Sequence, residues 1–399
     1  MYYIRSLKRF FSIFLIVILL LAVGLYLRPL PALQAQSILP AKSPVGAVSI
    51  PWPDYGQEAF GAMGYGVLAT SGQQKSAPIA SIAKIVTALS VLRQKPLSIG
   101  QQGPQLTIGP SDVALYNKYV AEQGSVVPVN DGEQISEYQM LEALLLPSGN
   151  NIADSLANWA FGSQSAYLTY ANNLVKTMGM NQTHLADASG FSPNSTSSAS
   201  DLVILGQAAI ANPVLASIVS QKTAVIPVAG TVHNVNWLLG IDGANGIKTG
   251  NTDQAGGCFL FAAKQNIGGQ TIQVIGAVLG APDSTDPTQA IDDSQSIIEA
   301  TGTNFHLLEM AKSGQSIGKI TAKWGASSPV VVKDNFELPV WNGSQPKIST
   351  KFKQIKGSAA AGANVGTASI TSGQKTQTVQ LVLQKKIPAP SPLWRIFHV

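Results

Sequence analysis

A serine and a lysine stand three positions apart, at Ser81 and Lys84. Residues 81–92 are predicted to form a helix, because apolar residues recur there at helical spacing. Residues at i and i+3 share one helix face, so the amine can reach the hydroxyl. A serine hydroxyl becomes a good nucleophile when a base takes its proton, and a lysine can be that base if burial and nearby positive charge lower its pKa. The serine–lysine spacing alone is also compatible with a lysine on an ordinary solvent-exposed helix face.

A second motif, Ser148-Gly149-Asn150, follows Pro147. It separates a helix predicted from Ser136, as N-cap, to Leu146 from a helix predicted over 151–159. A loop at this place can direct a hydroxyl and an amide into a cleft. Serine, glycine and asparagine are also ordinary turn residues, so a plain helix connection is the alternative interpretation.

A third motif, Lys248-Thr249-Gly250, precedes two apolar segments, 257–263 and 271–279, which are predicted to be strands joined by a turn at Gly268-Gly269. A strand edge here could align a substrate backbone. The lysine and threonine could bind a carboxylate, and the glycine leaves room for close approach. A tight turn with a solvated lysine is the alternative.

The three motifs in this order resemble those of the penicillin-binding protein and serine β-lactamase superfamily. The sequence is most similar to low-molecular-mass penicillin-binding proteins of the serine-type D-alanyl-D-alanine carboxypeptidase family, from about Val45 to Lys386. The resemblance implies an α+β fold, with a penicillin-binding protein/serine β-lactamase-like catalytic domain followed by a small all-β sandwich domain. The matching stretches are 144–151, 236–239, 246–250 and 278–281.

The resemblance also implies roles for single residues. Ser81 would be the acylated nucleophile and Lys84 its general base, while Ser148 and Asn150 would assist proton transfer and positioning. The backbone N–H groups of Ser81 and Asn251 would form the oxyanion hole. The enzyme would remove the terminal D-alanine from peptidoglycan stem peptides ending in D-Ala-D-Ala, and β-lactam antibiotics would acylate it.

The substrate side is implied in the same way. Lys248 and Thr249 would bind the substrate carboxylate, next to Gly250 and Asn251. Two departures from the family pattern stand out. Ala83 replaces a frequent threonine, which is a minor change, and residues 281–298 hold no arginine or lysine where such carboxypeptidases often carry an arginine. Carboxylate binding would therefore rest on the lysine and threonine, and substrate preference stays open.

Three other functions remain as alternatives. D,D-endopeptidase action on cross-links would use the same motifs. A class A β-lactamase uses a glutamate between the second and third motifs, and the sequence has none between Asn151 and Gly250. A catalytically degenerate wall-binding protein is the non-enzymatic alternative, although all three motifs are intact.

The N-terminus predicts the compartment. Arg5, Lys8 and Arg9 precede an apolar run from Phe10 to Leu27, which is long enough to cross most of a bilayer. Basic residues on its leading side place the rest of the chain outside the cytoplasmic membrane, in the periplasm or cell wall space. A weak signal-peptidase pattern lies at 31–35, but the length of the run favours an uncleaved anchor.

Composition excludes other classes. No block of basic residues points to nucleic acid, and no motif indicates a metal or an organic cofactor. The one cysteine, Cys258, is interpreted as a buried strand residue. The predicted organisation is a transmembrane anchor or signal over 1–28, a proline-punctuated linker over 29–44, a transpeptidase-like catalytic domain over 45–311, an all-β domain over 312–386 and a Pro-rich amphipathic tail over 387–399.

The tail ends in a short apolar segment. On a helix, Leu393, Ile396 and Phe397 would share one face, with Trp394 at its margin and Arg395 beside it. Such a segment is too short to span a bilayer but suits the membrane interface. Packing on the all-β domain is the equal alternative.

Overall fold

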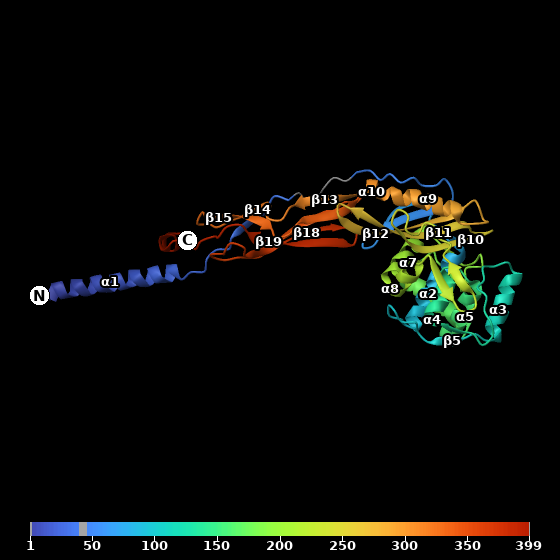
Figure 1. Cartoon of the computed structure of the whole chain (residues 1–399). Coiled ribbons are helices and arrows are strands. Elements are labelled where there is room, and N and C mark those ends of the chain that lie inside the picture. The colour runs from blue at the N-terminus through green and yellow to red at the C-terminus, as the bar shows by residue number, and fades with distance from the viewer. Residues whose placement is uncertain (1, 40–45, 399) are drawn as a thin grey trace. The chain divides into compact units, whose positions relative to one another are not determined.

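A computed structural model describes residues 2–39 and 46–398 (Figure 1). The end of the predicted linker and the final residue of the predicted tail lie outside the described residues. The chain divides into two compact units. We call residues 46–306 with 341–343 the mixed unit, and residues 1–45, 307–340 and 344–399 the β unit.

The mixed unit is built around a sheet of five antiparallel strands in the order β10-β11-β12-β2-β3. These strands are β2 (Gln57–Ala62), β3 (Gly66–Gly72), β10 (Ala244–Thr252), β11 (Gly256–Ile267) and β12 (Gln270–Ala281). Short two-stranded pairs are formed by β4 (Ala77–Pro78) with β7 (Thr196–Ser197), β5 (Gln105–Thr107) with β6 (Gln134–Ser136), and β8 (Thr223–Ile226) with β9 (Gly230–His233).

Helices cover both faces of this sheet (Figure 1). Those that contact the sheet include α7 (Ala199–Ala211), α8 (Pro213–Val219), α9 (Thr288–Glu299), α10 (Thr301–Asn304) and η1 (Ala80–Ile82). The other helices of the unit are α2 (Ala83–Gln94), α3 (Pro110–Ala121), α4 (Glu137–Leu145), α5 (Asn150–Phe161) and α6 (Gln164–Thr177). Alternate residues of β2 enter different cores: Ala59 packs among the helices on the α7 side, whereas Phe60 packs with residues of α9.

Local signals placed the predicted helices and strands within a few residues of their ends. Ser136 caps α4, and its Oγ accepts a hydrogen bond from Gln139 N, as the N-cap prediction requires. The glycines at 268 and 269 form the β11–β12 turn with positive φ. The first predicted helix begins with a 3-10 turn, so Ser81 lies in η1 and Lys84 in the first turn of α2.

The β unit has a sheet of six strands in the order β1-β14-β15-β19-β18-β17, and a pair formed by β13 and β16. These are β1 (Gln34–Ser37), β13 (Phe305–Ala311), β14 (Ser316–Thr321), β15 (Ser327–Val332), β16 (Phe336–Trp341), β17 (Lys347–Phe352), β18 (Asn364–Ser372) and β19 (Lys375–Leu383). Its core includes Ala311, Phe336 and Leu338 from the pair, packed with apolar residues of the larger sheet.

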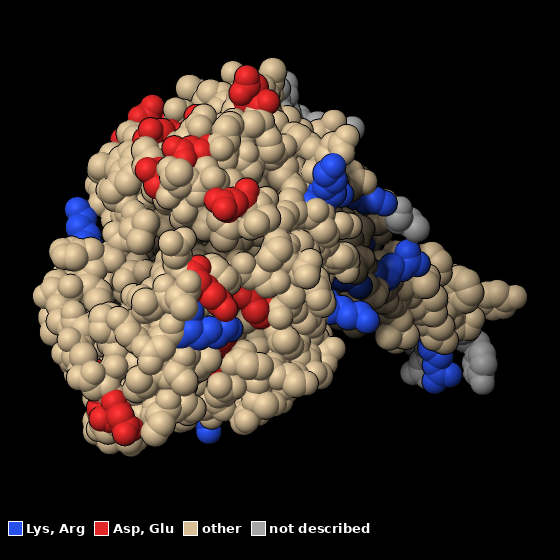
Figure 2. Space-filling view, turned by 90° about the vertical axis from the view of Figure 1, so that its right-hand side faces the viewer, with Lys and Arg blue, Asp and Glu red and all other residues tan. Residues whose placement is uncertain are grey.

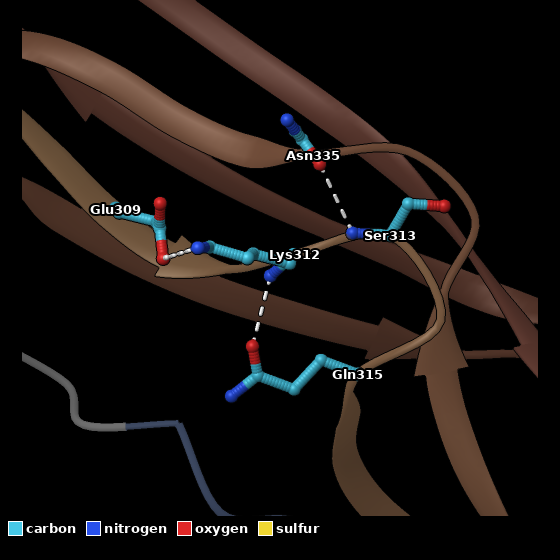
Figure 3. A network of polar contacts seen from close by, with 5 residues as sticks. All are labelled: Glu309, Lys312, Ser313, Gln315 and Asn335. Carbon is cyan, nitrogen blue, oxygen red and sulfur yellow. Dashed lines mark hydrogen bonds and ion pairs between the residues drawn. The ribbon is translucent and has the colours of Figure 1, made fainter. Parts of the chain in front are cut away.

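Polar contacts fix the turn that leads from β13 into β14 (Figure 3). Lys312 Nζ lies 3.9 Å from Glu309 Oε1, and Lys312 N donates to Gln315 Oε1 at 2.9 Å. Ser313 N donates to Asn335 Oδ1 at 3.1 Å, which ties the turn to the segment before β16.

The predicted linker differs from the structure, because it contains strand β1. Gln34 to Ser37 pair antiparallel with Thr321 to Gly318 of β14. Gly318 permits this pairing, since a Cβ at that position would lie 2.3 Å from Gln36 O. The sequence QAQS has no apolar alternation, so no local pattern predicted an edge strand here.

The N-terminal helix α1 (Tyr2–Tyr26) is long and apolar enough to cross a membrane over Ser6–Tyr26, with a mean hydropathy of 2.5. None of that window is buried within the protein. The helix therefore suggests membrane anchoring or secretion. At the other end of the chain, the tail forms helix α11 (Pro392–Phe397), also in the β unit.

On the face shown in Figure 2, several Lys and Arg side chains lie toward the right-hand side, and acidic side chains lie mainly over the upper and central parts. No continuous basic area forms on that face among the described residues.

Candidate active site

Ser81 and Lys84 face each other across the first turn of α2. Lys84 Nζ lies 2.7 Å from Ser81 Oγ, within hydrogen-bond distance. Lys84 is completely buried, while Ser81 is half-buried and lines a cavity of about 490 Å³. The hydroxyl is therefore reachable from the cavity, and the amine behind it is shielded from water.

The backbone before Ser81 adopts an uncommon conformation. Ala80 has φ +46°, in the left-handed region that non-glycine residues seldom occupy. Gly190 packs so closely that a Cβ there would lie 1.8 Å from Ala80 O. Such strain persists only when the surroundings impose it, and here it lies directly before Ser81.

The second motif reaches the same amine. Asn150 begins α5, and its Oδ1 accepts a hydrogen bond from Lys84 Nζ at 2.7 Å. Asn150 N donates to Ser125 O at 2.8 Å, which fixes the start of the helix. Ser148 lies buried on the connecting turn with φ +67°, two residues before Asn150.

The third motif lies on edge strand β10, alongside η1. Gly250 packs directly on the nucleophile, because a Cβ there would lie 2.9 Å from Ser81 N. Lys248 and Thr249 are buried, and Lys248 Nζ donates to Thr249 O at 3.0 Å. Asn251 lines the cavity with Ser81. The fold thus brings residues from three distant motifs around one serine.

Burial alters both lysines. Desolvation, reinforced by the positive charge of Lys248, lowers the pKa of Lys84 well below its usual value, while Asp187 and Asp154 act in the opposite direction. Desolvation also lowers the pKa of Lys248 to about 7. A neutral Lys84 beside the hydroxyl of Ser81 has the chemistry of a general base.

One support of Lys84 escaped the sequence analysis. Ser189 O accepts a hydrogen bond from Lys84 Nζ at 2.9 Å. Asp187 holds this loop in place: its carboxylate accepts hydrogen bonds from Ser189 Oγ at 2.7 Å, Gly190 N at 3.1 Å and Phe191 N at 2.8 Å. The only local signal is an aspartate before Ser and Gly, which is typical of side-chain-capped turns in general.

The cavity continues past the nucleophile. Glu122 and Asp253 are the charged residues among those that line it. Groups of His, Cys, Asp and Glu side chains able to hold a metal ion are absent from the described residues. Cys258 is fully buried on β11 and burial raises the pKa of its thiol to about 12, which confirms its interpretation as a strand residue.

Profiles of known families match both parts of the chain. The D-alanyl-D-alanine carboxypeptidase family matches residues 63–283, and the C-terminal domain of penicillin-binding protein 5 matches residues 305–389. Among curated proteins, a D-alanyl-D-alanine carboxypeptidase of Mycobacterium tuberculosis is 32% identical over 229 residues, which are 56% of this chain and 73% of the relative. One from Salmonella typhimurium is 25% identical over 358 residues, 86% of each chain.

Solved structures agree. The Streptomyces K15 DD-transpeptidase is 27% identical, with a TM-score of 0.56, and the match covers 63% of this chain and 98% of that one. Penicillin-binding protein 5 from Haemophilus influenzae has a TM-score of 0.60 at 20% identity, covering 86% of this chain and 100% of that one.

The fold is therefore that of the low-molecular-mass penicillin-binding proteins: an α+β catalytic domain of the penicillin-binding protein/β-lactamase type followed by a β-rich domain. The predicted fold class is confirmed. The chain belongs to the D-alanyl-D-alanine carboxypeptidase family.

Proposed function

We propose that this protein is a serine-type D-Ala-D-Ala carboxypeptidase that removes the terminal D-alanine from peptidoglycan stem peptides. The observation that carries the proposal is the 2.7 Å approach of a fully buried Lys84 Nζ to Ser81 Oγ at the wall of a cavity. Family membership supports the proposal, because it implies that the protein binds D-Ala-D-Ala peptides and β-lactams.

The proposed reaction combines the Ser81–Lys84 contact with the roles that the family resemblance implies for the other residues. Ser81 Oγ attacks the carbonyl carbon of the penultimate D-alanine while Lys84 Nζ takes the hydroxyl proton. The N–H groups of Ser81 and Asn251 stabilise the oxyanion, and Lys248 and Thr249 bind the terminal carboxylate. The C–N bond breaks, and D-alanine leaves with a proton relayed through Ser148. Water then hydrolyses the Ser81 ester, and the site returns to its first state.

The deciding experiment incubates the protein with a pentapeptide ending in D-Ala-D-Ala and measures free D-alanine. Ser81→Ala should abolish both D-alanine release and labelling by fluorescent penicillin, since no other hydroxyl lies beside Lys84 Nζ among the described contacts. Retained labelling would place the nucleophile elsewhere.

Two further substrates separate the alternatives. A cross-linked dimer cleaved faster than the pentapeptide would indicate an endopeptidase. Rapid steady turnover of penicillin would indicate a β-lactamase, whereas the proposed enzyme should stay acylated. A folded protein that neither labels nor releases D-alanine would be a degenerate wall-binding protein.

A further inference from the structure

A second cavity lies within the β unit, where α1 ends. Its volume is about 230 Å³. The end of α1 and the residues after it form one side, and α11 forms the other. Its lining combines basic and apolar side chains, among them Arg28, Lys323, Arg395, Leu25, Leu30 and Trp394.

Contacts between the two ends of the chain build this cavity. The guanidinium of Arg395 lies 4.7 Å from the ring centre of Tyr26, and Arg395 Nη2 donates to Arg28 O at 3.2 Å. The ring of Trp394 packs at 5.5 Å against that of Trp324, which lies between β14 and β15. The tail therefore packs on the β unit, and the same contacts hold Arg395 at the cavity.

The charge of the cavity is of one sign. Arg28, Lys323 and Arg395 line it, and none of its lining residues is acidic. Among the described residues, none of the three forms an ion pair, and the side-chain ion pair found there joins Lys312 to Glu309. Three cations gathered without a carboxylate favour an anionic ligand.

The position of the cavity indicates the source of that anion. The apolar window of α1 ends at Tyr26 and, at ~1.5 Å per residue, is long enough to cross the hydrocarbon core. Residues just beyond such a span lie at headgroup level. Beside the cavity, Leu393 and Phe397 are 67% and 73% exposed, as expected of side chains that contact acyl chains.

We propose that this cavity binds the phosphate of an anionic phospholipid headgroup. Arg28, Lys323 and Arg395 surround the phosphate, while Leu393 and Phe397 enter the bilayer beside it. Both ends of the chain thus contribute to one lipid site, which requires that α1 is retained. The site is independent of the reaction proposed for Ser81.

Native mass spectrometry of the detergent-purified full chain tests this, with equal amounts of phosphatidylglycerol and phosphatidylcholine. The wild type should retain phosphatidylglycerol at least tenfold better. Arg28→Gln/Lys323→Gln/Arg395→Gln should retain both lipids equally. The matched control, Lys347→Gln/Lys351→Gln/Lys353→Gln, removes three exposed cations at and just beyond β17 in the same unit and should behave as the wild type.

Several results would overturn the proposal: no preference in the wild type, an unchanged preference in the triple variant, or an equal loss in the control. Displacement of the lipid by 10 mM inorganic phosphate, but not by sodium chloride of the same ionic strength, would assign the site to free phosphate instead. Circular dichroism and thermal unfolding report whether each variant is folded, independently of the reaction proposed for Ser81. If the triple variant fails to fold, the single variant Lys323→Gln replaces it in the test, because it changes only one exposed side chain. This single variant should weaken the preference for phosphatidylglycerol about threefold.

Discussion

At the scale of single residues, the two buried lysines set the expected pH dependence. Lys84 accepts the Ser81 proton only when neutral, so acylation should fall as the pH drops through its lowered pKa. Lys248 attracts a carboxylate only when protonated, so peptide binding should weaken as the pH rises through about 7. A pH profile of kcat/KM should therefore be bell-shaped.

The Lys84→Ala variant checks the acid side of this profile. It should still bind penicillin but acylate about 10²–10⁴-fold more slowly, because the general base is lost. Its remaining rate should no longer depend on pH in the acid range. An unchanged acylation rate, measured by stopped-flow with a fluorescent penicillin, would remove Lys84 from this role.

Asp187 is expected to act through Lys84 rather than on substrate. In Asp187→Asn, one carboxylate oxygen becomes a donor facing the N–H groups of its own loop, so Ser189 should shift and acylation should slow. Loss of the negative charge also lowers the pKa of Lys84 further, so the acid limb should move to lower pH.

The matched control is Asp201→Asn. Asp201 is buried, whereas Asp187 is half-buried; Asp201 also accepts from a loop N–H, at Gln182, but does not act on the pKa of Lys84. If Asp187→Asn slows acylation but leaves the pH of the acid limb unchanged, the role of Asp187 is purely structural.

At the scale of elements, strand β1 should depend on the glycine beneath it. Gly318→Val places a side chain against Gln36 O, where even a Cβ would lie at 2.3 Å, and should detach β1 from β14. Hydrogen exchange of the Gln34–Ser37 amides should then speed up at least about tenfold. Lys319→Val adds the same side chain at an exposed neighbouring position and should leave exchange unchanged. Equal protection in both variants would contradict the role of Gly318.

At the scale of the whole molecule, the tail should contribute weakly to membrane binding. Strand β1 spans Gln34–Ser37, so α1 has to be removed by a cut after Arg28 that leaves the strand intact. Residues 29–399 should bind anionic liposomes partially at low salt, and residues 29–387 should not, because the exposed Leu393 and Phe397 are lost. Co-sedimentation measures both. If both forms stay in the supernatant, the tail is not a membrane contact.

The sequence by itself determined the motifs and the elements that have local signals. The Ser81–Lys84 spacing, the cap at Ser136 and the glycine turn at 268–269 are short-range features, because helix periodicity, capping and turn geometry depend on residues a few positions apart. The order of three intact motifs then indicated the family, which the comparisons show.

Only the tertiary structure decided the rest. Strand β1 forms because β14 offers an edge more than 280 positions later, and Ser189 reaches Lys84 across 105 positions. The cation-lined cavity exists because the two ends of the chain meet. Backbone pairing and desolvation arise from neighbours that are remote along the chain, and no window of the sequence contains them.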